Sequence, residues 1–253
     1  MVNTMKKNFR FSISYDGTRY LGWEHQPGTD MTIQGKLESV ISRMVNSDGI
    51  VELIGAGRTD AGVHAKAMIF NCFLDTEMNE KEIKDYCNSY LPEDICVNDV
   101  KVAGERFHSR YNATGKTYRY SLYVGDSKPV FDRKYVWTLE KEPDIKLMKE
   151  AAEYLKGEHD FASFCANPKM KKTTVRLVDK IEIVKKEDYI YLTFHGNGFL
   201  QHMVRILTGT LVEVGLKERT PENVGEVLEA KDRKLAGVTA PASGLCLIEV
   251  DYS

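Results

Sequence analysis

The chain has 253 residues, 42% of them apolar, and is long enough to bury one large hydrophobic core or two smaller ones. Its formal net charge of −2 argues against a protein coated in basic residues for unspecific nucleic-acid binding. It contains no apolar run long enough to span a bilayer, and residues 1–10 lack the apolar core of a signal peptide. We therefore expect a cytoplasmic protein that does not bind a membrane.

The cysteines and histidines do not form a metal-binding pattern. The five cysteines are scattered, lack a Cys-x-x-Cys pair and are predicted to be buried, reduced thiols. The six histidines also lack the spacing of a ligand cluster. The pair His159-Asp160 leaves a metal-dependent hydrolase as an alternative, but we expect no metal site.

Strand and helix signals alternate in the first part of the chain. Residues 9–15 alternate between apolar and polar and stop at Asp16-Gly17, which predicts a strand. Thr32 and Asn79 each precede an amphipathic stretch and are predicted to cap helices. Further strands are expected over residues 50–54, 65–73 and 95–102.

The second part of the chain repeats this order of elements, although not the residues themselves. Strands are predicted over residues 116–124, 173–184, 189–195 and 244–252, and helices over 145–154, 199–214 and 221–230. On the helix 199–214, the apolar residues fall on one face, and Arg205 lies opposite with Gln201 and Thr208. Arg205 is then either solvent-exposed or a partner for a phosphate or carboxylate.

The order strand, helix, strand, strand, helix, strand is that of the split βαβ, or ferredoxin-like, unit. The sequence therefore predicts an α+β fold with two ferredoxin-like halves, residues 1–103 and 104–253, built on mixed or antiparallel sheets. A large ligand would lie in a cleft between the halves. We expect this central cleft to bind RNA.

Residues 55–65, Gly-Ala-Gly-Arg-Thr-Asp-Ala-Gly-Val-His-Ala, are typical of a site loop because glycine permits close approaches and unusual backbone angles. Arg58 and Asp60 are two positions apart and can share a face or converge in a turn. A nearby guanidinium lowers the pKa of a carboxylate, which would keep Asp60 ionised as a nucleophile or base. Gly57 and Thr59 are predicted to line the same site.

Two other interpretations of this loop compete with a catalytic one. The first is that Asp60 closes a turn beside a solvated arginine. The second is a dinucleotide-binding fingerprint, which is rejected because its sixth position is Asp and the residues that follow alternate like a strand.

Two segments combine positive charge with features suited to RNA. Residues 106–119 contain four basic residues, among them Arg110, interleaved with aromatic rings and without an acid. Unpaired RNA needs both kinds of side chain, because phosphates attract charge and unstacked bases need a flat partner. Residues 167–176 carry another four basic residues around an Asn-Pro turn, and three of them are predicted to grip phosphates: Lys169, Lys171 and Lys172. Each segment could instead be an ordinary solvated strand or hairpin arm.

Five groups of motifs are spread over nearly the whole chain. They are Tyr15-Asp16-Gly17-Thr18 with Gly22-Trp23, residues 55–65, residues 157–161 (Gly-Glu-His-Asp-Phe), residues 197–200 with 202–205 (Asn-Gly-Phe-Leu and His-Met-Val-Arg), and Ala236-Gly237 with residues 241–245 (Pro-Ala-Ser-Gly-Leu). In this set the chain resembles the A-type tRNA pseudouridine synthases, which isomerise uridine at positions 38, 39 and 40 of the anticodon stem-loop.

The resemblance implies specific roles for five residues. Asp60 would be the catalytic aspartate, and Arg58 would pair with it and help to hold the flipped nucleotide. Tyr118 would stack on the target base, Arg205 would support the aspartate, and Leu245 would pack near the base. The resemblance also implies a homodimer that works on tRNA without metal or cofactor.

Three positions depart from the pattern that the resemblance suggests. Glu24 stands where the family usually has Gln, and residues 201–206 read Gln-His-Met-Val-Arg-Ile instead of His-His-Met-Val-Arg-Asn. A paralogue acting on another RNA, and a noncatalytic RNA-binding protein on the same fold, are therefore kept as alternatives. Retention of both Asp60 and Arg58 favours the enzyme over the binder.

Overall fold

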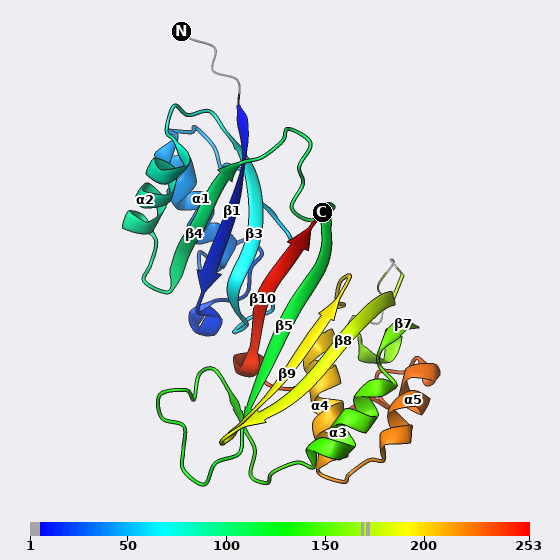
Figure 1. Cartoon of the computed structure of the whole chain (residues 1–253). Helices are drawn as coiled ribbons and strands as arrows, with labels where there is room; N and C mark the ends of the chain where they lie inside the picture. Colours follow the sequence, from blue (N-terminus) through cyan, green and yellow to red (C-terminus); the bar gives the residue numbers. More distant parts are fainter. Residues whose placement is uncertain (1–5, 168–169, 171–172) are drawn as a thin grey trace. The chain divides into compact units, whose positions relative to one another are not determined.

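The computed structural model describes residues 6–167, 170 and 173–253, and the chain forms two compact units (Figure 1). Unit 1 comprises Met1–Thr114 together with Leu247–Ser253, and unit 2 comprises Gly115–Cys246. The boundary predicted after residue 103 and the RNA-binding cleft between halves remain predictions.

Unit 1 contains the predicted split βαβ arrangement. Its strands are β1 (Lys7–Tyr15), β2 (Ile54–Gly55), β3 (His64–Leu74) and β4 (Ile95–Val102), with residues 247–252 of β10 (Leu245–Tyr252) beside β3. The order β4-β1-β3, with β2 paired to β3, is antiparallel throughout, as a ferredoxin-like sheet requires. The alternation predicted for the first strand is confirmed, because Phe9, Phe11, Ile13 and Tyr15 are buried.

The two helices of unit 1 begin where their caps predict. The Thr32 hydroxyl accepts from the Gly35 amide at 3.2 Å and begins α1 (Ile33–Met44). Asn79 begins α2 (Glu80–Tyr90) with a capping box, in which its side chain accepts from the Glu82 amide and Glu82 accepts from the Asn79 amide. Both helices pack on the same sheet (Figure 1).

Unit 2 follows a related pattern. Its strands are β5 (Ala113–Tyr123), β6 (Trp137–Thr138), β7 (Gly157–Asp160), β8 (Val175–Lys186) and β9 (Tyr189–Gly196), and its helices are α3 (Ile145–Glu153), α4 (Met203–Gly215) and α5 (Pro221–Ala230). The order β5-β9-β8-β7 is antiparallel, and the two-residue β6 runs parallel to β5. Strands β6 and β7 were not predicted.

Short 3-10 turns occur in both units: η1 (Gly17–Arg19) in unit 1, and η2 (Ala162–Phe164) and η3 (Ala242–Gly244) in unit 2. With helices and largely antiparallel strands in each unit, the α+β class is confirmed.

The strand predicted over residues 50–54 is wrong, since β2 contains only Ile54 and Gly55. The Val51 amide donates to the Ser42 hydroxyl at 2.8 Å instead of to a neighbouring strand. The Ile50 side chain is 68% exposed. This segment therefore follows the end of α1 and does not extend the sheet.

The helix predicted from Phe199 begins four residues later, at Met203. His202 has a left-handed backbone with φ of 60°, which a helix cannot continue through, and the Asn197 amide bonds to the Leu177 carbonyl of β8. The amphipathic assignment is also wrong, because Thr208, placed on the polar face, is buried and donates to the Val204 carbonyl. Helix α4 is thus buried on most of its circumference.

All five cysteines are free thiols, but the prediction that all are buried is wrong for two of them. Cys96 is exposed and Cys246 is partly exposed. Burial raises the pKa of the Cys72 thiol and raises that of Cys87 to about 12. Across the described residues, the helices are too short or too polar for any of them to cross a bilayer.

Candidate active site

Asp60 lies at the start of a tight turn between β2 and β3. The Val63 amide donates to the Asp60 carbonyl at 3.1 Å, which closes a four-residue turn. Gly62 occupies the third position of that turn with φ of 77°, where a type II turn requires a positive φ. The glycine therefore has the conformational role predicted for this loop.

Burial alternates along the residues that lead into the turn. Thr59 is 7% exposed and its hydroxyl lies 2.8 Å from the Tyr15 hydroxyl, so this side chain points into the core of unit 1. Arg58 on one side is exposed, and Asp60 on the other is partly exposed. This alternation is the pattern expected for an extended segment, and the partly exposed Gly57 precedes Arg58.

The segment 15–23 clamps this loop through close backbone contacts. A Cβ at Gly17 would lie 2.0 Å from the Val63 carbonyl oxygen, and the Gly17 amide donates to Nδ1 of His64 at 3.0 Å. At Gly22, with φ of 100°, a Cβ would lie 2.7 Å from the Thr59 carbonyl oxygen. Only glycine permits approaches this close. Sequence reasoning missed this role of residues 15–23, for which the two glycines were the available signal.

Two main-chain hydrogen bonds join the segment 15–23 to the Asp60 loop, and an ion pair joins it to Asp94. The Gly62 amide donates to the Tyr20 carbonyl at 3.2 Å, and the Trp23 amide donates to the Thr59 carbonyl at 3.1 Å. The Tyr20 hydroxyl donates to Asp94, which also pairs with Arg19 at 2.8 Å. Burial, together with this hydrogen bond to Asp94, raises the pKa of Tyr20 to about 12, so its hydroxyl stays protonated at neutral pH.

Arg58 forms an ion pair with Glu24. One guanidinium nitrogen of Arg58 contacts a carboxylate oxygen of Glu24, and both side chains are solvent-exposed. Glu24 is the residue that departs from the expected Gln of this motif. The pairing of Arg58 with Asp60 remains a prediction.

In unit 2, the predicted stacking residue Tyr118 lies on β5 opposite Phe194 of β9. It is 8% exposed, and its ring meets Phe199 edge-on, with centroids 5.3 Å apart and planes at 85°. Phe199 is held outside α4 by the left-handed His202, so the late start of that helix provides the contact. This packing fixes the Tyr118 ring within unit 2.

Arg205 lies in the first turn of α4 and is half-buried. Its Nε donates to the Ala240 carbonyl at 2.7 Å, and the Ala240 amide donates back to the Arg205 carbonyl at 3.2 Å. Plain solvent exposure, one of the two interpretations of this residue, is therefore wrong. The guanidinium is tied to a backbone segment that comes from another part of the chain.

Leu245 follows η3 and is 5% exposed. The turn before it is held against β5, because the Tyr120 hydroxyl donates to the Pro241 carbonyl at 2.6 Å. A Cβ at Gly244 would lie 2.5 Å from the Tyr120 ring. Burial raises the pKa of Tyr120 far above its usual value, so the hydroxyl remains a donor to Pro241.

Of the basic residues predicted to contact phosphates, the structure describes Arg110. Arg110 is exposed on unit 1, beside the His108 and Tyr111 rings, whose centroids are 4.1 Å apart. Ser109, by contrast, is buried and donates to Asn71. Lys169, Lys171 and Lys172 lie outside the described residues.

His159 and Asp160 make structural contacts in unit 2. One ring nitrogen of His159 lies 2.8 Å from the Lys156 carbonyl oxygen, and Asp160 pairs with Lys231 at 3.0 Å. The Thr174 hydroxyl donates to Asp160 at 2.5 Å and is the main cause of the lowered pKa of this carboxyl. Within residues 6–167, 170 and 173–253, no group of three or more His, Cys, Asp or Glu residues could hold a metal ion.

Comparison with known proteins places the chain in a family. Residues 12–112 and 151–253 match the family model described as tRNA pseudouridine synthase. The chain is 42% identical to a "tRNA pseudouridine synthase A 2" of Bacillus cereus, over 97% of this chain and 99% of that protein. It is 45% identical to the "tRNA pseudouridine synthase A" of a Bacillus species over the same shares. A protein of the same name from Clostridium kluyveri is 42% identical over 97% of this chain and all of its own length.

The chain therefore belongs to the tRNA pseudouridine synthase family. It is an isomerase, which converts uridine to pseudouridine in tRNA. This finding favours the enzyme over the metal hydrolase and the noncatalytic binder.

Proposed function

We propose that this protein isomerises uridine at positions 38, 39 and 40 of the tRNA anticodon stem-loop, with Asp60 as its catalytic residue. One observation carries the assignment of Asp60. Its partly exposed carboxylate stands on a turn that is fixed by Gly62 and held by the close contacts of Gly17 and Gly22. A group that must act at one atom of a large substrate needs such a rigid support.

The reaction is an internal rearrangement that one carboxylate can serve. The bond between N1 of uracil and C1′ of the ribose breaks, the base rotates, and C5 bonds to the same sugar carbon. C5 loses its hydrogen to water and N1 gains one, so nothing is oxidised. Asp60 either attacks the sugar or base to form a covalent adduct, or removes the C2′ proton to give a glycal. A glycoside hydrolase would normally require a second carboxylate near the first. The motif around Asp60 has an arginine instead.

The other residues hold the flipped nucleotide. Removing a base from its stack costs a few kcal/mol, and one aromatic stacking contact returns about 1–3 kcal/mol. Tyr118 supplies that contact, Leu245 packs near the base, Arg205 supports the carboxylate of Asp60, and Arg58 fills the space that the base leaves.

The remaining contacts in the proposal concern the RNA and the assembly. Gly57 and Thr59 line the nucleotide site, and the basic residues Arg110, Lys169, Lys171 and Lys172 contact phosphates. The protein acts as a homodimer in the cytoplasm without metal or cofactor. Its free cysteines are consistent with a reducing compartment.

Tritium release from tRNA labelled with [5-³H]uridine tests the proposal, because pseudouridine formation removes the hydrogen at C5. The purified protein is expected to release tritium in the presence of a chelator, and mapping should place pseudouridine at positions 38, 39 and 40. Release with modification elsewhere would make the protein a paralogue with another target. Tight binding without release from any RNA would favour a noncatalytic binder.

Replacing Glu24 by glutamine is expected to tighten tRNA binding about threefold and to steepen its salt dependence. The Glu24 carboxylate pairs with the Arg58 guanidinium and repels phosphate, so it competes with RNA for Arg58. Its removal should cost little stability, because an exposed ion pair stabilises a protein by only about 0–1 kcal/mol. One additional phosphate contact steepens the slope of log K against log salt by about 0.7–0.9. Filter binding at several salt concentrations measures both quantities.

The control for this variant is Glu77→Gln, which removes the same charge from an exposed position. Glu77 follows β3 at its far end, and β3 carries the chain about 35 Å from the Asp60 turn. An equal gain in affinity from both variants would mean that only net charge matters, and no gain from Glu24→Gln would show that the ion pair does not compete with RNA.

A further inference from the structure

One stripe of α4 carries Arg205, Gly209 and Glu213, spaced four residues apart and therefore on one face of the helix. The segment 235–240, which follows α5, runs along this stripe in the opposite direction. Ala240 exchanges two hydrogen bonds with Arg205, as described above. A Cβ at Gly209 would lie 2.0 Å from the Val238 carbonyl oxygen, so the segment touches the helix backbone there.

Glu213 anchors the other end of this contact. Its Oε1 accepts from the Val238 amide at 2.8 Å, and its Oε2 accepts from Nε of Arg219 at 2.5 Å. The side chain is only 14% exposed. Both carboxylate oxygens of a largely buried charge are thus bonded, which is the condition for burying it.

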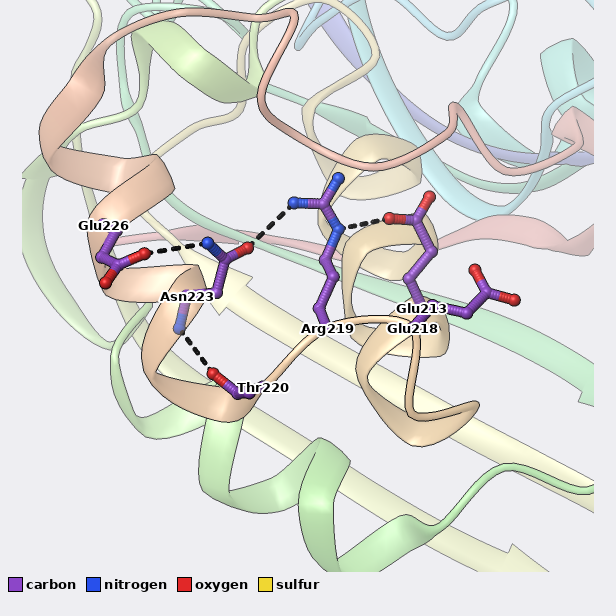
Figure 2. Close-up of a pocket in the computed structure, with 6 residues that line it drawn as sticks. All are labelled: Glu213, Glu218, Arg219, Thr220, Asn223 and Glu226. Carbon is purple, nitrogen blue, oxygen red and sulfur yellow. Dashed lines mark hydrogen bonds and ion pairs between the residues drawn. The ribbon is translucent and has the colours of Figure 1, made fainter.

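Arg219 extends the anchor to the beginning of the segment. Its Nη1 donates to the Leu235 carbonyl at 2.7 Å and to Asn223 of α5 at 3.0 Å. Figure 2 shows the guanidinium between Glu213 on one side and Asn223 on the other. The pair Glu213–Arg219 therefore bonds to the segment at two residues and joins it to two helices.

A second arginine holds the middle of the segment. Arg233 donates to the carbonyls of Ala236 and Gly237 and to the Thr239 hydroxyl, at distances of 2.9 to 3.3 Å. The Gly237 amide donates to the buried Thr210 hydroxyl of α4 at 2.9 Å. The segment 235–240 is thus fixed by side chains along its length and ends at the carbonyl that receives Arg205.

We propose that Glu213 is a positioning residue for Arg205: it sets the segment 235–240 on α4, and the Ala240 carbonyl then fixes the plane of the Arg205 guanidinium. A guanidinium is planar, so a bond at Nε determines where its other two nitrogens point. The inference rests on the proposed role of Arg205 in the reaction. It adds to that role a residue two helical turns away on the same face of α4.

Glutamine cannot replace Glu213 in this arrangement. The carboxylate only accepts hydrogen bonds, and it accepts one on each oxygen. A glutamine can still accept from the Val238 amide, but its NH₂ group would then face the donor Nε of Arg219. Arg219 must move away, and its bond to the Leu235 carbonyl is lost with it.

The test compares Glu213→Gln with Glu218→Gln. Glu218 lines the same pocket and is exposed, and Figure 2 draws no interaction from its side chain to the other five residues. In steady-state assays on tRNA, Glu213→Gln should lower kcat about 10- to 100-fold and leave KM within about threefold, because a small misplacement of a catalytic group costs that much. Glu218→Gln should match the wild type. Arg219→Gln, which removes the cation and leaves the Glu213 carboxylate in place, should lower the rate in the same direction.

A double variant and a spectroscopic measurement separate positioning from general damage. If Glu213 acts through Arg205, Glu213→Gln should slow an Arg205→Lys enzyme far less than it slows the wild type. Hydrogen exchange at the Arg205 Nε–H, followed by NMR, should be about tenfold faster in Glu213→Gln and unchanged in Glu218→Gln. Equal slowing in both backgrounds, or unchanged exchange, would overturn the proposal.

The same experiments distinguish a failure of the proposed function from a failure of the positioning role of Glu213. Wild-type rates in Arg205→Lys, or no tritium release by the wild type, would refute the proposed role of Arg205 or the proposed function. The exchange measurement needs no activity and would still decide whether Glu213 fixes the Arg205 side chain.

Discussion

Replacing Asp60 by asparagine is expected to abolish pseudouridine formation, because losing a general base lowers a reaction rate by about 10²–10⁴-fold. The affinity for tRNA should stay within a few-fold of that of the wild type. The amide has the size of the carboxylate but is neither a nucleophile nor a base. It should leave the turn intact, because the turn is closed by the Asp60 backbone carbonyl and by Gly62. Tritium release and filter binding on the same preparation measure the two effects.

The control for Asp60→Asn is Asp48→Asn, which makes the same chemical change at an exposed residue between α1 and β2. It should retain full activity. Pseudouridine formation by Asp60→Asn at a rate near that of the wild type would remove Asp60 from the catalytic role. A large loss of tRNA binding would instead assign it to recognition.

Replacing Tyr118 should separate its ring from its hydroxyl. Tyr118→Phe keeps the ring and is expected to retain activity within about tenfold of the wild type. Tyr118→Ala is expected to lose at least about 5- to 150-fold, because stacking on the base contributes about 1–3 kcal/mol and the Phe199 contact is lost as well. Single-turnover rates at saturating enzyme measure the difference.

The alanine variant also leaves a cavity in a buried position, which costs about 3–5 kcal/mol of stability. Thermal unfolding should therefore accompany the assay, and Phe199→Leu serves as a control that removes the edge-on contact and keeps Tyr118. If Tyr118→Phe were as inactive as Tyr118→Ala while remaining folded, the hydroxyl would be indispensable.

Local signals predicted most of the fold. Thr32 and Asn79 begin helices where their side chains suggested, because a cap acts on amides only two or three residues away. Pro221 likewise marks the first residue of α5. The alternation in β1 reflects one buried face, which the sequence encodes directly.

Elements that depend on distant contacts were predicted poorly. The start of α4 is set by the left-handed His202 and by a bond between Asn197 and β8, neither of which has a periodic signal. Strand β7 contains only four residues and is defined by its pairing with β8. Part of the apparent polar face of α4 is covered by segment 235–240, which bonds to Arg205 and Glu213, and the periodicity of the helix cannot indicate this.

In the candidate site too, local features were predicted from the sequence and contacts between distant residues were not. The glycines around Asp60 indicated a site loop, since their conformational role is local. The close backbone contacts on that loop come from Gly17 and Gly22, which are far away in sequence, and the ion pair of Arg58 with Glu24 also required the structure. The contact between Arg205 and Ala240 joins residues 35 positions apart and required the structure.

The course of β10 has a consequence for how the protein is made. Residues 247–253 belong to unit 1, where Tyr252 donates to the Ser109 carbonyl and receives Arg10 over its ring, but the ribosome makes them only after all of unit 2. At ordinary rates of translation, the nascent unit 1 must wait roughly ten seconds for this strand, with the edge of β3 beside it uncovered. A chain that stops short of residue 247 therefore leaves unit 1 without the strand that pairs with β3.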